Sequence, residues 1–361
     1  MSEALPFIPP HGESHHRQSK GGAALRRLGF PLAAVLRHRV VQTGLGLALG
    51  GALLWFAFAR INIADLGRRL AQVQIAWLLL ALACYWAALA IRSWRWRIIL
   101  SPVSRLSFLQ VYHGLVVGYA ANNVLPARLG ELVRADYLGR RHGISRLSIV
   151  GTIVVERLFD VIVFIGFIVV GIAGLHGHSN SKIPEILHAV ELIALACVLL
   201  GLMLFALIRF RHKQLPASLS FLENPIRSLT AGLHLISGFQ EVIMLVAATV
   251  VVWTADSTST WLLCRAMDVN PSLMDLILIM GMSCGAALLP AAPANAGALQ
   301  AALQLAFILL GFGEAAGNQL GFELALLVQG CFVGTCTLAG AALYFASSVG
   351  QTARRASTRS S

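Results

Sequence analysis

Residues 122–134 read NNVLPARLGELVR and close the apolar segment Phe108–Leu125. This stretch combines two amides, a proline, a glycine and three ionisable side chains, Arg128, Glu131 and Arg134. A charged side chain at the centre of a lipid-facing helix costs about 2.5–3.5 kcal/mol on insertion scales, so such residues face protein, a water-filled cavity or the interface. The stretch is therefore a candidate functional site, provided that the chain spans a membrane.

The composition indicates that it does. Hydrophobic residues make up 57% of the 361 positions and charged residues only 12%, whereas about a quarter of the residues of soluble domains are charged. A helix needs about 20 mostly apolar residues to cross a bilayer. Windows of roughly that length recur at Val40–Ala59, Ile75–Ile91, Leu147–Ile172, His188–Ile208, Val242–Leu263 and Glu323–Ala346. The sequence predicts an all-α polytopic membrane protein with about six full transmembrane helices.

The positions of the basic residues and of the cysteines argue against a nucleic-acid-binding protein and against a metal site. The net charge is +12, but the basic residues lie in short loops beside apolar spans, which is typical of topology determinants and not of nucleic-acid binding. The six cysteines have no metal-ligand spacing, so we expect no metal and no cofactor. The predicted organisation is a disordered basic cytoplasmic tail at 1–39, a helical membrane domain at 40–347, and a short basic cytoplasmic tail at 348–361.

Loop charges predict a re-entrant hairpin around the opening stretch. Four arginines precede Phe108–Leu125 in the expected loop Arg92–Ser107, and five follow it between Arg128 and Arg146. A full crossing would place one of these basic loops outside, against the positive-inside rule. We expect the segment to enter from the cytoplasm and return. The later loops, including an outside loop at Gly311–Phe322 without Lys or Arg, then place both termini in the cytoplasm.

A second break interrupts the apolar run Met274–Leu310 near Pro290. Its sequence Pro293-Ala-Asn295-Ala-Gly297 shares the pattern Pro-Ala-x-x-Gly with Pro126–Gly130. Paired discontinuous segments of opposite orientation indicate a transporter's midplane site. We therefore predict two broken hairpins that form an inverted repeat. Two short full spans, or a chance match of the pattern, are the alternatives.

Further charges interrupt the predicted spans. Glu156, Arg157 and Asp160 are spaced to share one helical face. They form either a structural ion-pair network or a carrier site for a lipid phosphate or a proton. Asp256 either lines the cavity or pairs with an arginine. In the segment Arg92–Arg97 we expect the tryptophans at head-group level and the arginines outward, as a membrane anchor. A receptor for a lipid head group is the alternative.

Three motifs resemble those of the lysylphosphatidylglycerol synthase transmembrane-region family, over about Gly44–Phe345. They are Arg92-x-x-Arg95-Trp96, Asn122-x-x-x-Pro126-x-Arg128-x-Gly130-Glu131-x-x-Arg134, and Glu156-Arg157-x-x-Asp160. The resemblance implies a multi-pass protein of the bacterial inner membrane with a flippase-like domain. It implies a substrate site at Asn122, Arg128, Glu131, Arg134, Glu156, Arg157 and Asp160.

The second hairpin departs from the family pattern. The family usually has Pro-Gly-Gly-x-Gly-x-x-Glu there, whereas this chain has Asn295 in place of a glycine and Gln300 in place of the acidic residue. Both residues remain candidates for substrate binding, while any carboxylate-dependent step at this hairpin is in doubt. No soluble aminoacyl-transferase domain follows the last span, so we expect a stand-alone member without lysyl transfer.

These features favour a lipid flippase or lipid-transport component over an enzyme. Arg128 and Arg134 are expected to bind the anionic part of a head group, while the carboxylates balance the charge. The partners are then membrane lipids and lipid-biosynthesis proteins. The alternatives are a membrane transferase acting on a lipid-linked sugar, with Glu131 or Asp160 as general base, and a non-transporting subunit of a lipid-biosynthetic complex, for example for hopanoids.

The topology makes a direct prediction. A cysteine that replaces Arg140 is expected to react with an impermeant thiol reagent only from the cytoplasmic side, because both flanks of the first hairpin lie there. Labelling of this position from the outside would remove the re-entrant hairpin.

Overall fold

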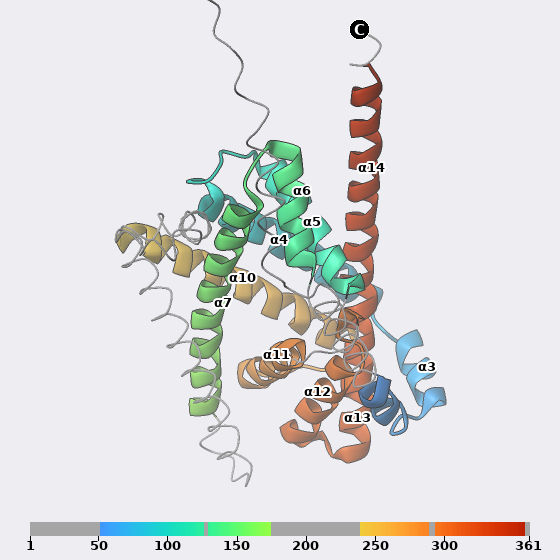
Figure 1. The fold of residues 1–361 in the computed structure, drawn as a ribbon. Coiled ribbons are helices and arrows are strands. Elements are labelled where there is room, and N and C mark those ends of the chain that lie inside the picture. The colour runs from blue at the N-terminus through green and yellow to red at the C-terminus, as the bar shows by residue number, and fades with distance from the viewer. Residues whose placement is uncertain (1–50, 126–128, 175–238, 289–292, 358–361) are drawn as a thin grey trace, which may run out of the picture. The chain divides into compact units, whose positions relative to one another are not determined.

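A computed structural model of the chain describes residues 51–125, 129–174, 239–288 and 293–357, with side chains placed for 51–125, 129–161, 240–286 and 293–347. Within these ranges every regular element is helical (Figure 1). The α-helices are α3 (Ile63–Ala71), α4 (Ile75–Leu100), α5 (Phe108–Val124), α6 (Gly130–His142), α7 (Arg146–Gly174), α10 (Phe239–Ala266), α11 (Leu273–Leu288), α12 (Ala298–Phe307), α13 (Glu314–Leu327) and α14 (Thr335–Ser357). A 3₁₀ turn, η5 (Pro293–Asn295), and two π-helical segments, η6 (Ile308–Phe312) and η7 (Val328–Gly334), connect them.

The described residues contain four helical runs long and apolar enough to cross a membrane, Ile75–Leu100, Gln240–Ala266, Pro293–Phe312 and Glu314–Ser347. This confirms the all-α polytopic membrane class. The predicted window His188–Ile208 lies outside the described residues, as do the tail 1–39 and the first part of Val40–Ala59. The exact number of spans and the orientation of the termini stay predictions.

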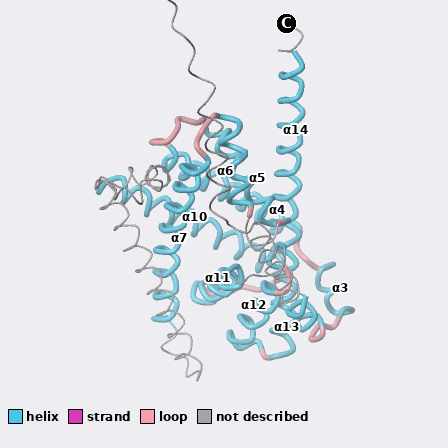
Figure 2. The backbone as a smooth tube through the Cα atoms, viewed as in Figure 1, coloured by secondary structure: helices cyan, strands magenta, loops and turns pink. Residues whose placement is uncertain are grey.

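Helix α4 is longer than the sequence predicted. The expected loop Arg92–Ser107 is helical as far as Leu100, and only 101–107 form a connection (Figure 2). The expectation that the arginines point outward is wrong for Arg95, which is fully buried together with Trp96. The helix can continue because carboxylates on α7 and α10 neutralise Arg95 and Arg92. Trp94 and Arg97, on the opposite face, are exposed.

The expected outside loop Gly311–Phe322 is also mostly helix. A tight turn at Gly311 and Gly313, both with positive φ, separates η6 from α13, which begins at Glu314. The segment contains polar residues such as Asn318, so no apolar window covers it, yet this face of α13 packs against α12. Gln304 of α12 donates a hydrogen bond to the backbone carbonyl of Asn318 at 3.3 Å, and Asn318 and Gln319 are only 4% and 8% exposed. The polar residues are therefore interior contacts and not loop residues.

Helices α5 and α6 form an antiparallel pair in a close register (Figure 1). A Cβ added to Gly114 would meet the Leu138 side chain, and one added to Gly118 would lie 2.7 Å from the Arg134 Cβ. A Cβ on Gly130 would lie 2.2 Å from the Gly118 carbonyl oxygen. Small residues of this kind let membrane helices approach closely. The turn itself, including Pro126 and Arg128, lies outside the described residues.

The second break has a comparable form. Helices α11 and α12 pack against each other, and the chain between them contains η5, where Ala294 and Asn295 adopt positive φ, and Gly297 with φ 83°. Pro293 begins η5, whereas Pro290 lies outside the described residues. The turn η5 packs against α5, so the second break lies beside the first hairpin. The side of the membrane from which each pair enters stays a prediction.

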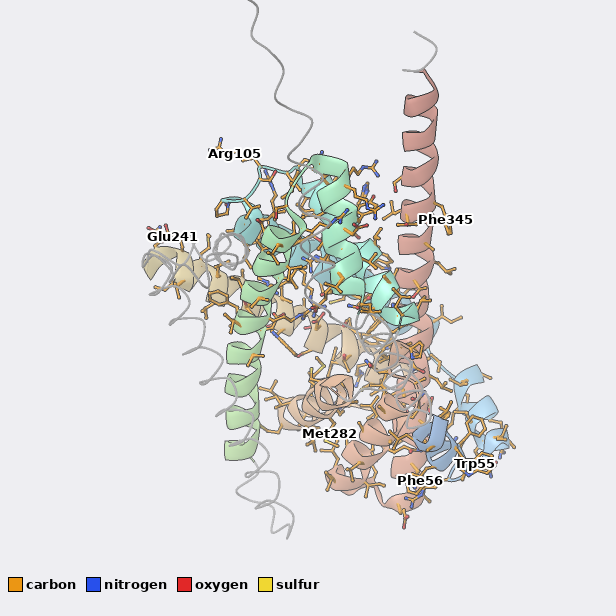
Figure 3. All side chains as sticks on the ribbon, in the orientation of Figure 1. Trp55, Phe56, Arg105, Glu241, Met282 and Phe345 are labelled. Atoms are coloured by element: carbon orange, nitrogen blue, oxygen red, sulfur yellow. The ribbon has the colours of Figure 1, made fainter. Side chains whose placement is uncertain are left out.

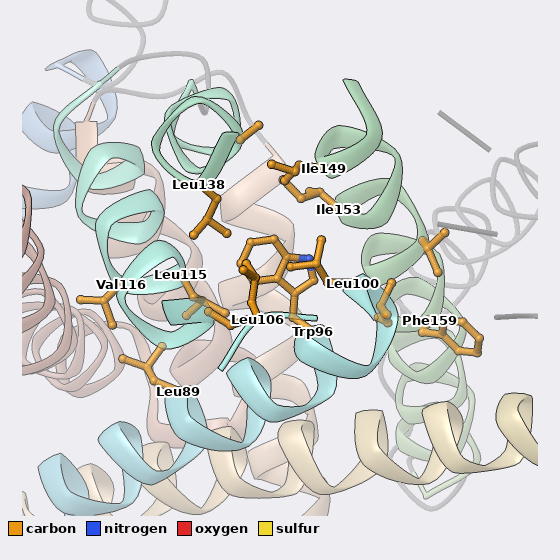
Figure 4. Packing of buried hydrophobic residues seen from close by; sticks show 14 of the residues in the cluster. Leu89, Trp96, Leu100, Leu106, Leu115, Val116, Leu138, Ile149, Ile153 and Phe159 are labelled. Carbon is orange, nitrogen blue, oxygen red and sulfur yellow. The ribbon is translucent and has the colours of Figure 1, made fainter. Parts of the chain in front are cut away.

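The main apolar core surrounds Trp96. Leucine and isoleucine side chains from α4, α5, α6 and α7 enclose its indole ring (Figure 4): Leu100, Leu115, Leu138, Ile149 and Ile153. The Trp96 Nε1 group donates a hydrogen bond to the Thr152 hydroxyl at 3.1 Å. A satisfied indole at the centre fixes α4 against α7, which positions the charged residues on both helices.

The register of α5 and α6 can be tested at Gly130. Gly130→Ala is expected to lower the thermal unfolding midpoint in detergent, since a methyl group forced into the backbone of α5 costs about 1–3 kcal/mol. Gly281→Ala on α11 is the matched control, because a Cβ there would meet no atom of the described residues within 4 Å. Equal midpoints for both variants would contradict the described register.

Candidate functional site

Six charged side chains on α4, α6 and α7 form a connected series of ion pairs in which positive and negative charges alternate. Its order is Arg134, Glu156, Arg95, Asp160, Arg157 and Glu131. Both ends lie on α6, three residues apart, so the contacts run from α6 through α7 and α4 and return to α6. We call these six residues the charge network. It contains three arginines and three carboxylates and is therefore neutral.

Arg95 occupies the centre of the charge network. Its Nη1 donates to an Asp160 oxygen at 2.6 Å and to the Thr249 hydroxyl of α10 at 2.8 Å, and its Nη2 donates to Glu156 at 3.2 Å. Hydrogen bonds of this kind between ions are about twice as strong as neutral ones. Arg95 thus joins α4 to α7 and α10 at one point.

The two ends of the network differ in exposure. Arg95, Arg134 and Glu156 are 0–1% exposed, whereas the side chains of Arg157 and Glu131 are 37% and 32% exposed. Arg157 bonds to Glu131 through Nε at 3.0 Å and to Asp160 through Nη1 at 3.2 Å. An ion arriving from outside the bundle therefore meets the Arg157–Glu131 pair first.

Arg134 has unused hydrogen-bonding capacity. Its Nη2 lies 3.0 Å from Glu156 Oε2, but the alignment is not that of a hydrogen bond, and none of its three side-chain nitrogens has a hydrogen-bond partner among the described residues. Its guanidinium stacks over the Trp96 ring, 3.1 Å from the centroid. Such a contact stabilises a buried cation without using its N–H groups. Within the described part of the chain, Nε and Nη1 of Arg134 therefore have no acceptor, while Nη2 faces Glu156.

A second ion pair lies beside the network. Arg92 of α4 pairs with Asp256 of α10, and Arg92 also donates to the Tyr119 hydroxyl at 3.3 Å. Of the two roles proposed for Asp256, the structure shows the pairing with an arginine.

The structure brings five of the sequence-predicted site residues into the charge network: Glu131, Arg134, Glu156, Arg157 and Asp160. Asn122 lies one turn from Gly118 on α5, where its Oδ1 is buried against Gly130 without a hydrogen-bond partner in the described part of the chain. Arg128 lies outside the described residues.

Asn295 and Gln300 take no part in the charge network. Gln300 accepts a hydrogen bond from the Gly297 N–H at 2.9 Å and donates to Gln329 of η7 at 2.8 Å. Gln329 in turn donates to the Ala294 carbonyl at 3.2 Å. The two glutamines therefore hold the break in place, and Gln329 reaches it from a π-helical segment, which often occurs at functional sites.

Sequence reasoning missed Arg95 as a network member, although its spacing from Arg92 places both on one face of α4. It also missed Glu323 on α13. This carboxylate is 2% exposed, and its Oε2 has no hydrogen-bond partner among the described residues. Within the described ranges no three His, Cys, Asp or Glu side chains are arranged to hold a metal ion.

The fold and the network define a polytopic helical membrane protein with buried, mutually compensating charges. The chain matches the family described as lysylphosphatidylglycerol synthase transmembrane region over residues 44–346. It therefore belongs to that family. No curated protein and no solved structure shows a significant match to the chain.

The network predicts a large cost for removing its central carboxylate. Glu156→Gln keeps the shape of the side chain but leaves Arg134 without a carboxylate partner, and breaking a buried pair in this way costs about 3–5 kcal/mol. The expected result is a clear drop in the unfolding midpoint. Asp136→Asn is the control, because this carboxylate pairs at the surface with Arg140 and Arg146, where pairs contribute about 0–1 kcal/mol.

The double variant Arg134→Gln/Glu156→Gln restores neutrality and is expected to be more stable than the sum of the single losses predicts. Additive losses would show that the two side chains do not interact.

Proposed function

We propose that the chain is a lipid flippase, or a component of lipid transport, for lipids with charged or bulky head groups. Family membership supports a membrane protein of this kind. The observation that carries the proposal is the charge network, which is buried at one end and accessible at the other. Intramembrane charges are expensive and typically mark a substrate pathway.

The charge count favours an anionic substrate. The three family motifs contain five arginines, at positions 92, 95, 128, 134 and 157, and Arg92 is paired with Asp256 of α10. The other four arginines stand against three carboxylates, Glu131, Glu156 and Asp160. The excess of one positive charge matches one phosphodiester. In the proposed cycle the head-group anion reaches Arg157, displaces Glu131 from it, and is bound by Arg128 and by Nε and Nη1 of Arg134.

The break between α5 and α6 supports the same proposal. A discontinuous helix pair places backbone N–H and C=O groups at the site, and such breaks are tolerated in a membrane only where they face protein or a cavity. The second break at η5 lies against α5, so both breaks adjoin one region. Paired breaks are a feature of alternating-access transporters. In this proposal both termini of the chain lie in the cytoplasm of a bacterium, and its partners are lipids and lipid-biosynthesis proteins.

The test is lipid transfer between leaflets of reconstituted liposomes. Fluorescent phosphatidylglycerol is placed in both leaflets, and an impermeant reductant reports the fraction that reaches the outside. Arg128→Ala and Arg157→Gln are each expected to slow transfer about tenfold or more, since a hydrogen bond to a charged group contributes about 1.5–3 kcal/mol. Arg140→Gln, on the exposed face of α6, is the matched control and should transfer lipid at the wild-type rate.

Wild-type rates in both variants would contradict the site. Formation of a sugar-modified lipid when a sugar donor is supplied would instead favour the transferase.

Glu131→Gln separates binding from transport. Because Glu131 competes with the head group for Arg157, its neutral replacement is expected to raise the affinity for anionic lipid while slowing release. Tighter binding together with slower transfer is the expected combination. Weaker binding would show that Glu131 contacts the lipid favourably and does not compete with it.

A further inference from the structure

Helix α4 presents arginines on two opposite faces. Arg92, Arg95 and Trp96 face the ion pairs described above. Trp94 and Arg97 lie on the other face, along with Ile98 and Ser101, one turn apart on the helix. This second face adjoins a cavity that the charge network does not share.

The cavity has a volume of about 460 Å³ and lies where α4 ends and the chain turns into α5. The end of α4 forms one wall and the connecting residues Ser104 to Ser107 form the other. Arg105 lies on this connection (Figure 3) and is one of the residues that line the cavity. Ligand sites commonly occupy about 300–1,000 Å³, so the cavity can hold a head group.

Two uncompensated cations line the cavity. No acidic side chain in the described ranges lies within ion-pair distance of Arg97 or Arg105. Arg97 donates from Nε to the Leu106 carbonyl at 3.0 Å. This contact holds the guanidinium against the connecting loop and leaves its two Nη groups for an acceptor. The cavity is therefore charged, whereas the network behind α4 is neutral.

Three serine hydroxyls, those of Ser101, Ser104 and Ser107, complete the lining. The Ser107 oxygen accepts from the Gln110 N–H at 3.4 Å, and Gln110 accepts from the Ser107 N–H at 2.8 Å. The start of α5 is thus capped by its own residues, and the Ser107 hydroxyl proton remains available to a ligand. Two guanidinium groups with neighbouring hydroxyls form a donor set suited to a phosphate group.

We propose that this cavity is a second binding site, specific for a phosphate group carried by a lipid head group or by a soluble phosphate ester. Trp94 at its edge is 46% exposed, and exposed tryptophans of membrane proteins lie at head-group level. The lipid is therefore the favoured source. The site does not depend on the proposed transport and holds its ligand whether or not lipid moves.

The test counts bound ligands on the full-length protein in neutral detergent by native mass spectrometry. The probes are short-chain phosphatidylglycerol, glycerol phosphate, and the matching diacylglycerol without phosphate. The variant is Arg97→Gln/Arg105→Gln. Its control, Arg140→Gln/Arg141→Gln, removes the same charge from the exposed face of α6.

Wild type and control are expected to bind the phosphate-bearing lipid equally, and Arg97→Gln/Arg105→Gln to bind one fewer per chain. The affinity of the lost site is expected to fall about tenfold or more for each arginine. Equal occupancy by glycerol phosphate would assign the site to soluble esters. Equal occupancy by diacylglycerol, or no loss in the Arg97/Arg105 variant, would overturn the proposal.

Two further variants remove the remaining ambiguities. Arg97→Lys/Arg105→Lys keeps the charge and is expected to retain part of the binding. If its unfolding midpoint matches that of the glutamine variant while only the latter loses the ligand, misfolding is excluded. Arg157→Gln should remove a different bound lipid, so a failure of the transport site and a failure of this cavity give distinguishable results.

Discussion

An ion buried away from water inside a membrane protein needs a counter-ion within hydrogen-bonding distance, because lipid cannot solvate it there. Much of this molecule follows from that constraint. Arg95 is fully buried on α4, where it bonds to Glu156 and Asp160 of α7 and to Thr249 of α10. Helix α6 contributes Arg134 and Glu131, which pair with Glu156 and Arg157 of α7. The apolar packing around Trp96 holds these helices at the distances that the ion pairs require. Charge pairing and hydrophobic packing therefore specify the same arrangement.

The close approach of α5 and α6 provides the second element of the site. Without side chains on Gly114 and Gly118, α6 lies directly on α5, and the stem of Arg134 occupies the space over Gly118. This places its guanidinium over Trp96 and beside Glu156. A glycine on one helix thus determines where an arginine on the next can reach.

The sequence was sufficient for the class, for the family and for the helical spacing of Glu156, Arg157 and Asp160. Apolar windows and loop charges indicate which residues lie in lipid and which lie in water, and they do so well for long helices. They do not report how residues relate to one another. Arg95 therefore looked like an interfacial anchor, since its partners lie 61 and 65 positions away on α7. Asn318 looked like a loop residue for the same reason, because it is buried by tertiary packing, with its backbone carbonyl bonded to Gln304 of α12.

The order of the charges along the chain has a consequence for synthesis. Arg95 leaves the ribosome 61 residues before Glu156, an interval of about 3–12 s at usual elongation rates. During this time α4 carries two arginines whose acidic partners do not yet exist. Arg95 gains its partners when α7 emerges, whereas Arg92 gains Asp256 only with α10, 164 residues after Arg92. We therefore expect α4 to stay near the insertion machinery or the membrane surface until these helices emerge. Membrane insertion of this domain is then expected to be cooperative, with α4 reaching its final depth only together with the helices that carry its carboxylate partners.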